Sequence, residues 1–88
     1  MPSFLVESYA ANGAFERERE CARHAARCGA GIHYIRTTFL PGDETLLHLF
    51  EAPSLEALRS AGTRAALHYE RIVEAVDAPG DAREEKQR

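Results

Sequence analysis

The chain lacks an excess of positive charge, and it also lacks any long apolar run. Its 88 residues carry 11 Lys and Arg against 14 Asp and Glu, a net charge of −3, which offers nucleic acid no broad basic surface to bind. No apolar stretch approaches the ~20 residues of a membrane-spanning helix. Residues 1–7 have neither the basic start nor the apolar segment of a secretory signal. These absences predict a cytoplasmic protein without nucleic-acid or membrane partners.

Cysteines are also scarce, with Cys21 and Cys28 seven positions apart in a predicted helix. That spacing separates their Cα atoms by ~10 Å, beyond the ~7 Å that a disulfide can span. They therefore cannot bridge each other in that helix, which agrees with a reducing compartment. With His24 between them they form a zinc- or nickel-like pattern on one helix side. We favour the simpler interpretation, in which both cysteines belong to the core stripe of the helix. The opposite, solvated face then carries residues 16–20, Arg23 and Arg27.

The motifs of common enzyme classes are missing as well. The glycines of Gly29-Ala30-Gly31 follow a helix rather than a strand, so they do not match a dinucleotide-binding loop. There is no nucleophile elbow and no basic, aromatic strand of the RNA-binding type. No organic cofactor is implied.

What is present predicts one small α+β domain over residues 1–78. Its strands are expected at residues 3–9, 32–40, 45–52 and 70–76, where β-branched and aromatic residues gather. Helices are expected over residues 13–28, with Asn12 as N-cap, and after Ser54, whose apolar face is Leu55, Leu58 and Ala61. Pro41 and Gly42 are expected to make the tight turn between the second and third strands, with a positive φ at the glycine. The polar tail, residues 79–88, has nothing to bury and is predicted to be disordered.

The order of these elements is β-α-β-β-α-β, the split or ferredoxin-like arrangement, with both helices on one face of an antiparallel sheet. The other face is left open. A single core in 88 residues gives only marginal stability, so we expect a second copy or a ligand to cover the open face. The expected assembly is a homodimer resembling a dimeric α+β barrel.

Alternation along the hairpin distributes the side chains between the two faces. If Leu40 lies opposite Thr45, one face carries Ile35, Thr37, Phe39, Leu46, His48 and Phe50, which suits the helices. The open face then carries Leu5, Glu7, Tyr9, Tyr34, Arg36, Leu47, Leu49 and Glu51.

The open face supplies the candidate catalytic residues. A carboxylate enclosed there would either pair with arginine or retain its proton, and the second case would make Glu7 or Glu51 a general acid or base. Tyr34 and Arg36 would orient a substrate of an isomerase, cyclase or cofactor-free oxygenase. In the alternative interpretation the carboxylates pair with Arg36 or Arg71 and only stabilise the interface.

Three histidines are the candidate metal ligands. His33 and His68 fall at strand ends, and His48 falls within the third strand. Imidazole together with carboxylate suits a divalent transition metal, at a surface site that could be shared across a dimer. In the alternative, His48 is a hydrogen-bonded core residue.

Several short runs resemble a family of small bacterial ferredoxin-like domains of unknown function, often labelled nickel-binding proteins. These runs are Phe4-Leu5-Val6-Glu7, the hairpin from Tyr34 to Glu44, Leu49 to Ser54 leading into Glu56 to Arg59, and Arg71 to Ala75. The resemblance covers residues 3–76. It implies a ferredoxin-like homodimer built sheet to sheet, with nickel or another divalent transition metal as its ligand.

Overall fold

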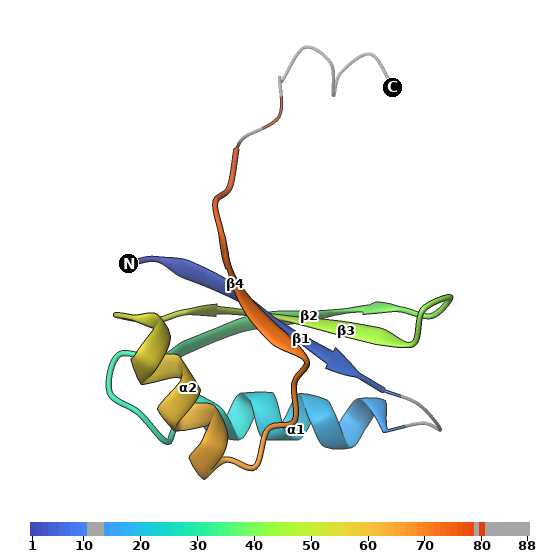
Figure 1. Ribbon diagram of the computed structural model, residues 1–88, viewed down its shortest axis with the longest axis horizontal. Helices are drawn as coiled ribbons and strands as arrows, with labels where there is room; N and C mark the ends of the chain where they lie inside the picture. Colours follow the sequence, from blue (N-terminus) through green and yellow to red (C-terminus); the bar gives the residue numbers. More distant parts are fainter. Residues whose placement is uncertain (11–13, 79, 81–88) are drawn as a thin grey trace.

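In a computed structural model of the protein, four strands form one antiparallel sheet with both helices on one side of it (Figure 1). The structure describes residues 1–10, 14–78 and 80. The elements follow in the order β1 (Ser3–Tyr9), α1 (Phe15–Ala25), β2 (His33–Leu40), β3 (Thr45–Glu51), α2 (Leu55–Arg64) and β4 (Arg71–Ala75). Across the sheet the order is β2-β3-β1-β4. An α+β fold of four antiparallel strands and two helices is thus confirmed.

The strands begin and end within one residue of their predicted limits, but α1 is shorter than predicted. It ends at Ala25 because the backbone N–H groups that follow donate hydrogen bonds to carbonyls three residues back. The N–H of Arg27 donates to His24 at 2.9 Å, and that of Cys28 donates to Ala25 at 3.0 Å. Both cysteines are free, as predicted. Neither helix in the described ranges is long and apolar enough to cross a membrane.

Two expectations concern residues that the structure does not describe. The predicted N-cap Asn12 lies outside the described residues, and so does the predicted disordered tail except at Gly80. The first described residue before α1 is Ala14, which stands at the N-cap position without a side-chain cap.

The turn between β2 and β3 uses a different residue from the one predicted. The N–H of Asp43 donates to the carbonyl of Leu40 at 3.1 Å, and that of Glu44 donates to Pro41 at 3.3 Å. The left-handed position is Glu44, with φ 51°, and not Gly42. The prediction of a positive φ at Gly42 was therefore wrong. Two consecutive turns complete the loop, and they place the last turn residue, rather than the glycine, in the left-handed region.

The core lies between the sheet and the two helices. Its members are Phe4, Val6, Ala22, Ala25, Ile32, Phe50, Ala52, Leu58, Ala61, Ala65 and Leu67. Alanines on both helices let their backbones approach the sheet closely. Helix α2 begins where predicted, because the Ser54 Oγ accepts the N–H of Ala57 at 3.1 Å.

Helix α2 ends in a Schellman motif that has alanine in the usual glycine position. The N–H of Leu67 donates to Gly62 at 2.9 Å, and that of Ala66 donates to Thr63 at 3.1 Å. Ala66 is exposed and has φ 58°, a conformation that costs a residue with a Cβ roughly 1–2 kcal/mol. Replacing Ala66 with glycine removes that cost.

We therefore expect Ala66→Gly to raise the free energy of unfolding by about 1 kcal/mol, measured by urea denaturation. The matched control is Ala26→Gly at the end of α1, where φ is −63°. There the same change should lower stability by about 0.5–1 kcal/mol. A loss of stability at both positions would contradict the assignment of strain to Ala66.

Candidate functional site

A bulge at Ile35 decides which side chains of β2 face the helices. Arg36 lies opposite Leu49, as predicted, but Tyr34 lies opposite Phe50 and not Glu51. One extra residue in β2 turns Tyr34 to the other face, where its ring packs against that of Phe50 with 5.6 Å between centroids. The prediction that Tyr34 belongs to the open face was wrong.

The turned Tyr34 completes a chain of hydrogen bonds beneath α1. Its hydroxyl lies 2.5 Å from the Oγ1 of Thr37, and that oxygen lies 2.8 Å from the Nδ1 of His48. Without the bulge, residues three apart in a strand would point to opposite faces. The bulge therefore lets Tyr34 and Thr37 reach one another and connects both to the imidazole on β3.

His48 is the buried end of this chain. It has no exposed surface, as expected for a residue on the helix-facing side of the sheet. Burial disfavours the charged imidazolium and lowers the pKa of His48 to about 4. The ring is therefore neutral near pH 7. Its Nε2 is also buried and has no hydrogen-bond partner among the described residues, as is the case for the Oε1 of Glu18 on α1.

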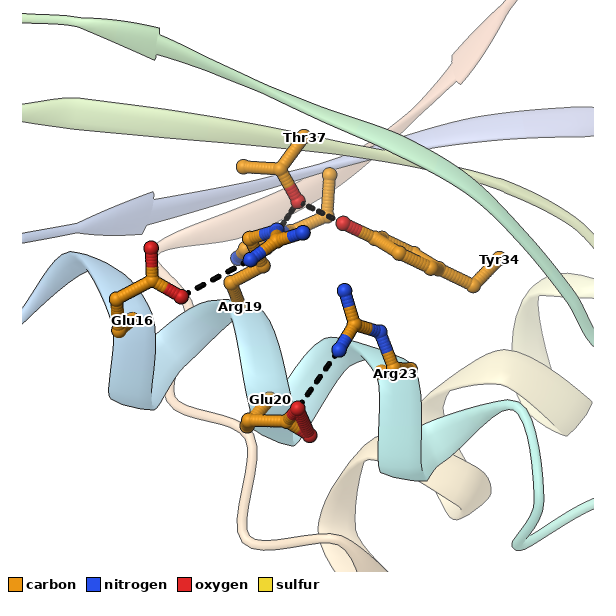
Figure 2. A network of polar contacts seen from close by, with 7 residues as sticks. Glu16, Arg19, Glu20, Arg23, Tyr34 and Thr37 are labelled. Atoms are coloured by element: carbon orange, nitrogen blue, oxygen red, sulfur yellow. Dashed lines mark hydrogen bonds and ion pairs between the residues drawn. The ribbon is translucent and has the colours of Figure 1, made fainter.

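Helix α1 presents more polar groups to the sheet than its sequence pattern indicates. Its buried residues are Glu18, Ala22 and Ala25, which share one face at spacings of four and three. The prediction that Glu18 belongs to the solvated face was thus wrong. Arg19 and Arg23, also assigned to that face, flank the buried residues, and Figure 2 shows their side chains pointing toward Thr37 and Tyr34.

Both arginines remain partly accessible and form ion pairs on α1. Arg19 contacts Glu16 at 2.9 Å and Arg23 contacts Glu20 at 2.7 Å, with 37% and 39% of the arginine side chains exposed. No motif in the sequence indicated that these arginines lie beside the hydrogen-bonded chain of Tyr34, Thr37 and His48. The one available signal was the spacing of four between two arginines bordering Ala22.

The four candidate catalytic residues are not brought together. Glu7, Arg36 and Glu51 share the open face through their pairings in the sheet, whereas Tyr34 lies on the opposite face. Glu7 forms an ion pair with Arg71, its Oε1 2.9 Å from the Nε, in agreement with the structural alternative. The described residues enclose no pocket.

The three candidate metal ligands also lie in different places. His33 is exposed on the open face opposite Glu51, and His48 is buried on the helix-facing side. His68 lies between α2 and β4, with its Nδ1 3.7 Å from the Oε2 of the buried Glu18. Within the described part of the chain, no three His, Cys, Asp or Glu side chains could together hold a metal ion. This also applies to Cys21, His24 and Cys28.

Comparisons with known proteins bear on the fold. No family model and no curated protein matches the chain. A crystal structure of the protein SCO4226 from Streptomyces coelicolor A3(2) superposes with a TM-score of 0.69 and covers 88% of this chain and 99% of that chain. The fold therefore has a solved counterpart. The two sequences are 17% identical, so the similarity establishes the architecture alone.

Proposed function

We propose that the protein is a ferredoxin-like homodimer, packed sheet to sheet, that binds a divalent transition metal. The uncovered face of the sheet supports the dimer. It carries Leu5, Leu47 and Leu49 on the two central strands, all half-buried, and the exposed Val73 on β4. Apolar side chains on an open sheet face favour a self-complementary partner surface, and a chain of this size gains stability from it.

His33 and Glu51 are the proposed metal ligands of each chain. They lie directly opposite each other at one end of the β2–β3 ladder, a position that places Cβ atoms roughly 4.5–5.5 Å apart. Imidazole and carboxylate are suitable ligands for nickel or zinc. One such pair does not complete a coordination shell, so the proposal requires further ligands from a second copy or from water.

Titration calorimetry with nickel tests this function on chelator-treated protein. We expect an affinity better than ~10 μM, weakening in acid because the ligand must be unprotonated imidazole. His33→Ala should abolish binding, and Glu51→Gln should weaken it by at least about tenfold.

The matched control is His24→Ala, which removes an exposed histidine from α1 and should leave the affinity unchanged. An equal loss in His24→Ala or in His68→Ala would contradict the assignment to His33. The absence of any nickel-induced heat in the wild-type protein would refute the metal-binding function itself.

A further inference from the structure

The hydrogen-bonded chain beneath α1 leaves unused donor groups at its accessible end. Thr37 lies between two partners, and its hydroxyl has one proton to donate and two lone pairs with which to accept. One arrangement that joins all three side chains has Thr37 donate to one partner and accept from the other. When the Nδ1 of His48 carries the ring proton and donates to Thr37, the Thr37 proton goes to Tyr34. The Tyr34 hydroxyl is then free to donate away from the sheet.

The hydrogen-bond accounting favours this direction of the chain. In the reverse direction, the ring proton of the neutral His48 would lie on Nε2, which is buried without a partner. Among buried backbone groups, an N–H without an acceptor is rarer than an under-satisfied acceptor, and the same preference favours an unprotonated Nε2 on His48. With Thr37 donating to Tyr34, the imidazole directs the Tyr34 hydroxyl outward as a donor.

The two arginines add positive charge at the same place. Each uses one terminal nitrogen in its pair with Glu16 or Glu20, and a guanidinium has five N–H donors. Figure 2 shows the Arg23 guanidinium pointing toward the Tyr34 hydroxyl. Strand β2 is at the edge of the sheet, so this side of the α1–sheet contact is reached from solvent. The donors that remain at this edge stand beside the carboxylates of Glu16 and Glu20, whose side chains are 72% and 59% exposed.

We propose that Arg19, Arg23 and Tyr34 form a binding site for a small oxyanion, a carboxylate or a phosphate, at the edge between α1 and β2. A planar guanidinium binds such groups through paired N–H bonds. Thr37 and His48 are positioning residues, because they act through the Tyr34 hydroxyl. The site lies on the helix-covered side of the sheet and does not depend on the dimer or on a metal.

Amide spectra recorded by NMR during titration with inorganic phosphate, and separately with acetate, at constant ionic strength, test the proposal. We expect saturable shifts in α1 and β2, and Arg23→Ala should raise the dissociation constant at least about tenfold, because it removes charge-assisted bonds. Glu20→Gln should tighten binding, because it removes the competing carboxylate. Tighter binding of phosphate or of acetate identifies which oxyanion the site prefers.

The matched control is Arg17→Ala, which removes the same charge from the exposed side of α1 and should change the dissociation constant by less than about twofold. The ring signals of His48 should shift on binding in the wild-type protein and stay fixed in Tyr34→Phe. Equal weakening by Arg17→Ala and Arg23→Ala would overturn the proposal, as would shifts that do not saturate at tens of millimolar of either anion.

Discussion

The free energy of unfolding should fall by about 3 kcal/mol between pH 7 and pH 4 through His48 alone. The ordinary pKa of histidine is 6.5, and burial lowers that of His48 to about 4. Below pH 6.5 the imidazole of His48 is protonated in the unfolded chain but stays neutral in the folded chain. Stability is therefore lost as the pH falls. The loss levels off once the pH is below about 4, where both states are protonated. Each unit of difference between the pKa values in the folded and unfolded states is equivalent to 1.36 kcal/mol of stability.

Urea denaturation at several pH values measures this effect in the wild-type protein and in His48→Leu. Carboxylates also titrate in this range, so the difference between the two proteins isolates His48. The substituted leucine is of similar volume, and Thr37 retains its contact with Tyr34. His24→Leu, at an exposed position on α1, should behave as the wild type does. Parallel stability curves for the wild type and His48→Leu would show that the imidazole is not buried as described.

Truncating Phe50 to alanine should destabilise the protein by about 3–5 kcal/mol. Phe50 has no exposed surface, and it is the largest of the fully buried side chains. Alanine would leave a cavity under α1 and remove the packing partner of Tyr34. A chain of 88 residues has a total stability of roughly 4–13 kcal/mol, so this one change should bring the protein near its unfolding threshold.

Phe39→Ala is the comparison for Phe50. Phe39 stacks on Phe15 with 5.4 Å between centroids, but 36% of it is exposed on the edge strand. Its truncation should cost about 1 kcal/mol. Calorimetric or chemical unfolding of both variants gives the comparison, and equal losses would mean that the core does not lie where the structure places it.

The sequence predicted the elements well because their signals are local. Alternation, the Ser54 cap and the Pro41 turn are each set within a few residues. The alternation of β3 also correctly placed His48 toward the helices and Glu51 on the open face.

The site was predicted less well, because it depends on two features without a local signal. The bulge at Ile35 inserts a residue in a stretch that has no glycine, and it turns the side chain of Tyr34 to the other face of the sheet. The rotation of α1 about its axis, which buries Glu18, is set by packing against the sheet. Polar residues facing a sheet from a helix contradict the usual amphipathic pattern, and the pattern therefore assigned them to solvent.

The pairing of carboxylates on the open face was predicted as one of two alternatives. Glu7 follows the structural one, because Arg71 lies directly opposite it on β4. Glu51 lies opposite His33, and its role depends on what covers the open face.

The proposed metal site needs ligands beyond those of one chain, and a second copy on the open face would supply them. Light scattering coupled to size-exclusion chromatography measures the mass of the protein in solution. We predict about twice the 9.8 kDa of one chain, and a return to one chain for Leu49→Arg, which places a charge in the middle of the open face. Thr63→Arg, at an exposed position on α2, should remain dimeric. A wild-type mass of one chain at micromolar concentration would refute the proposed dimer.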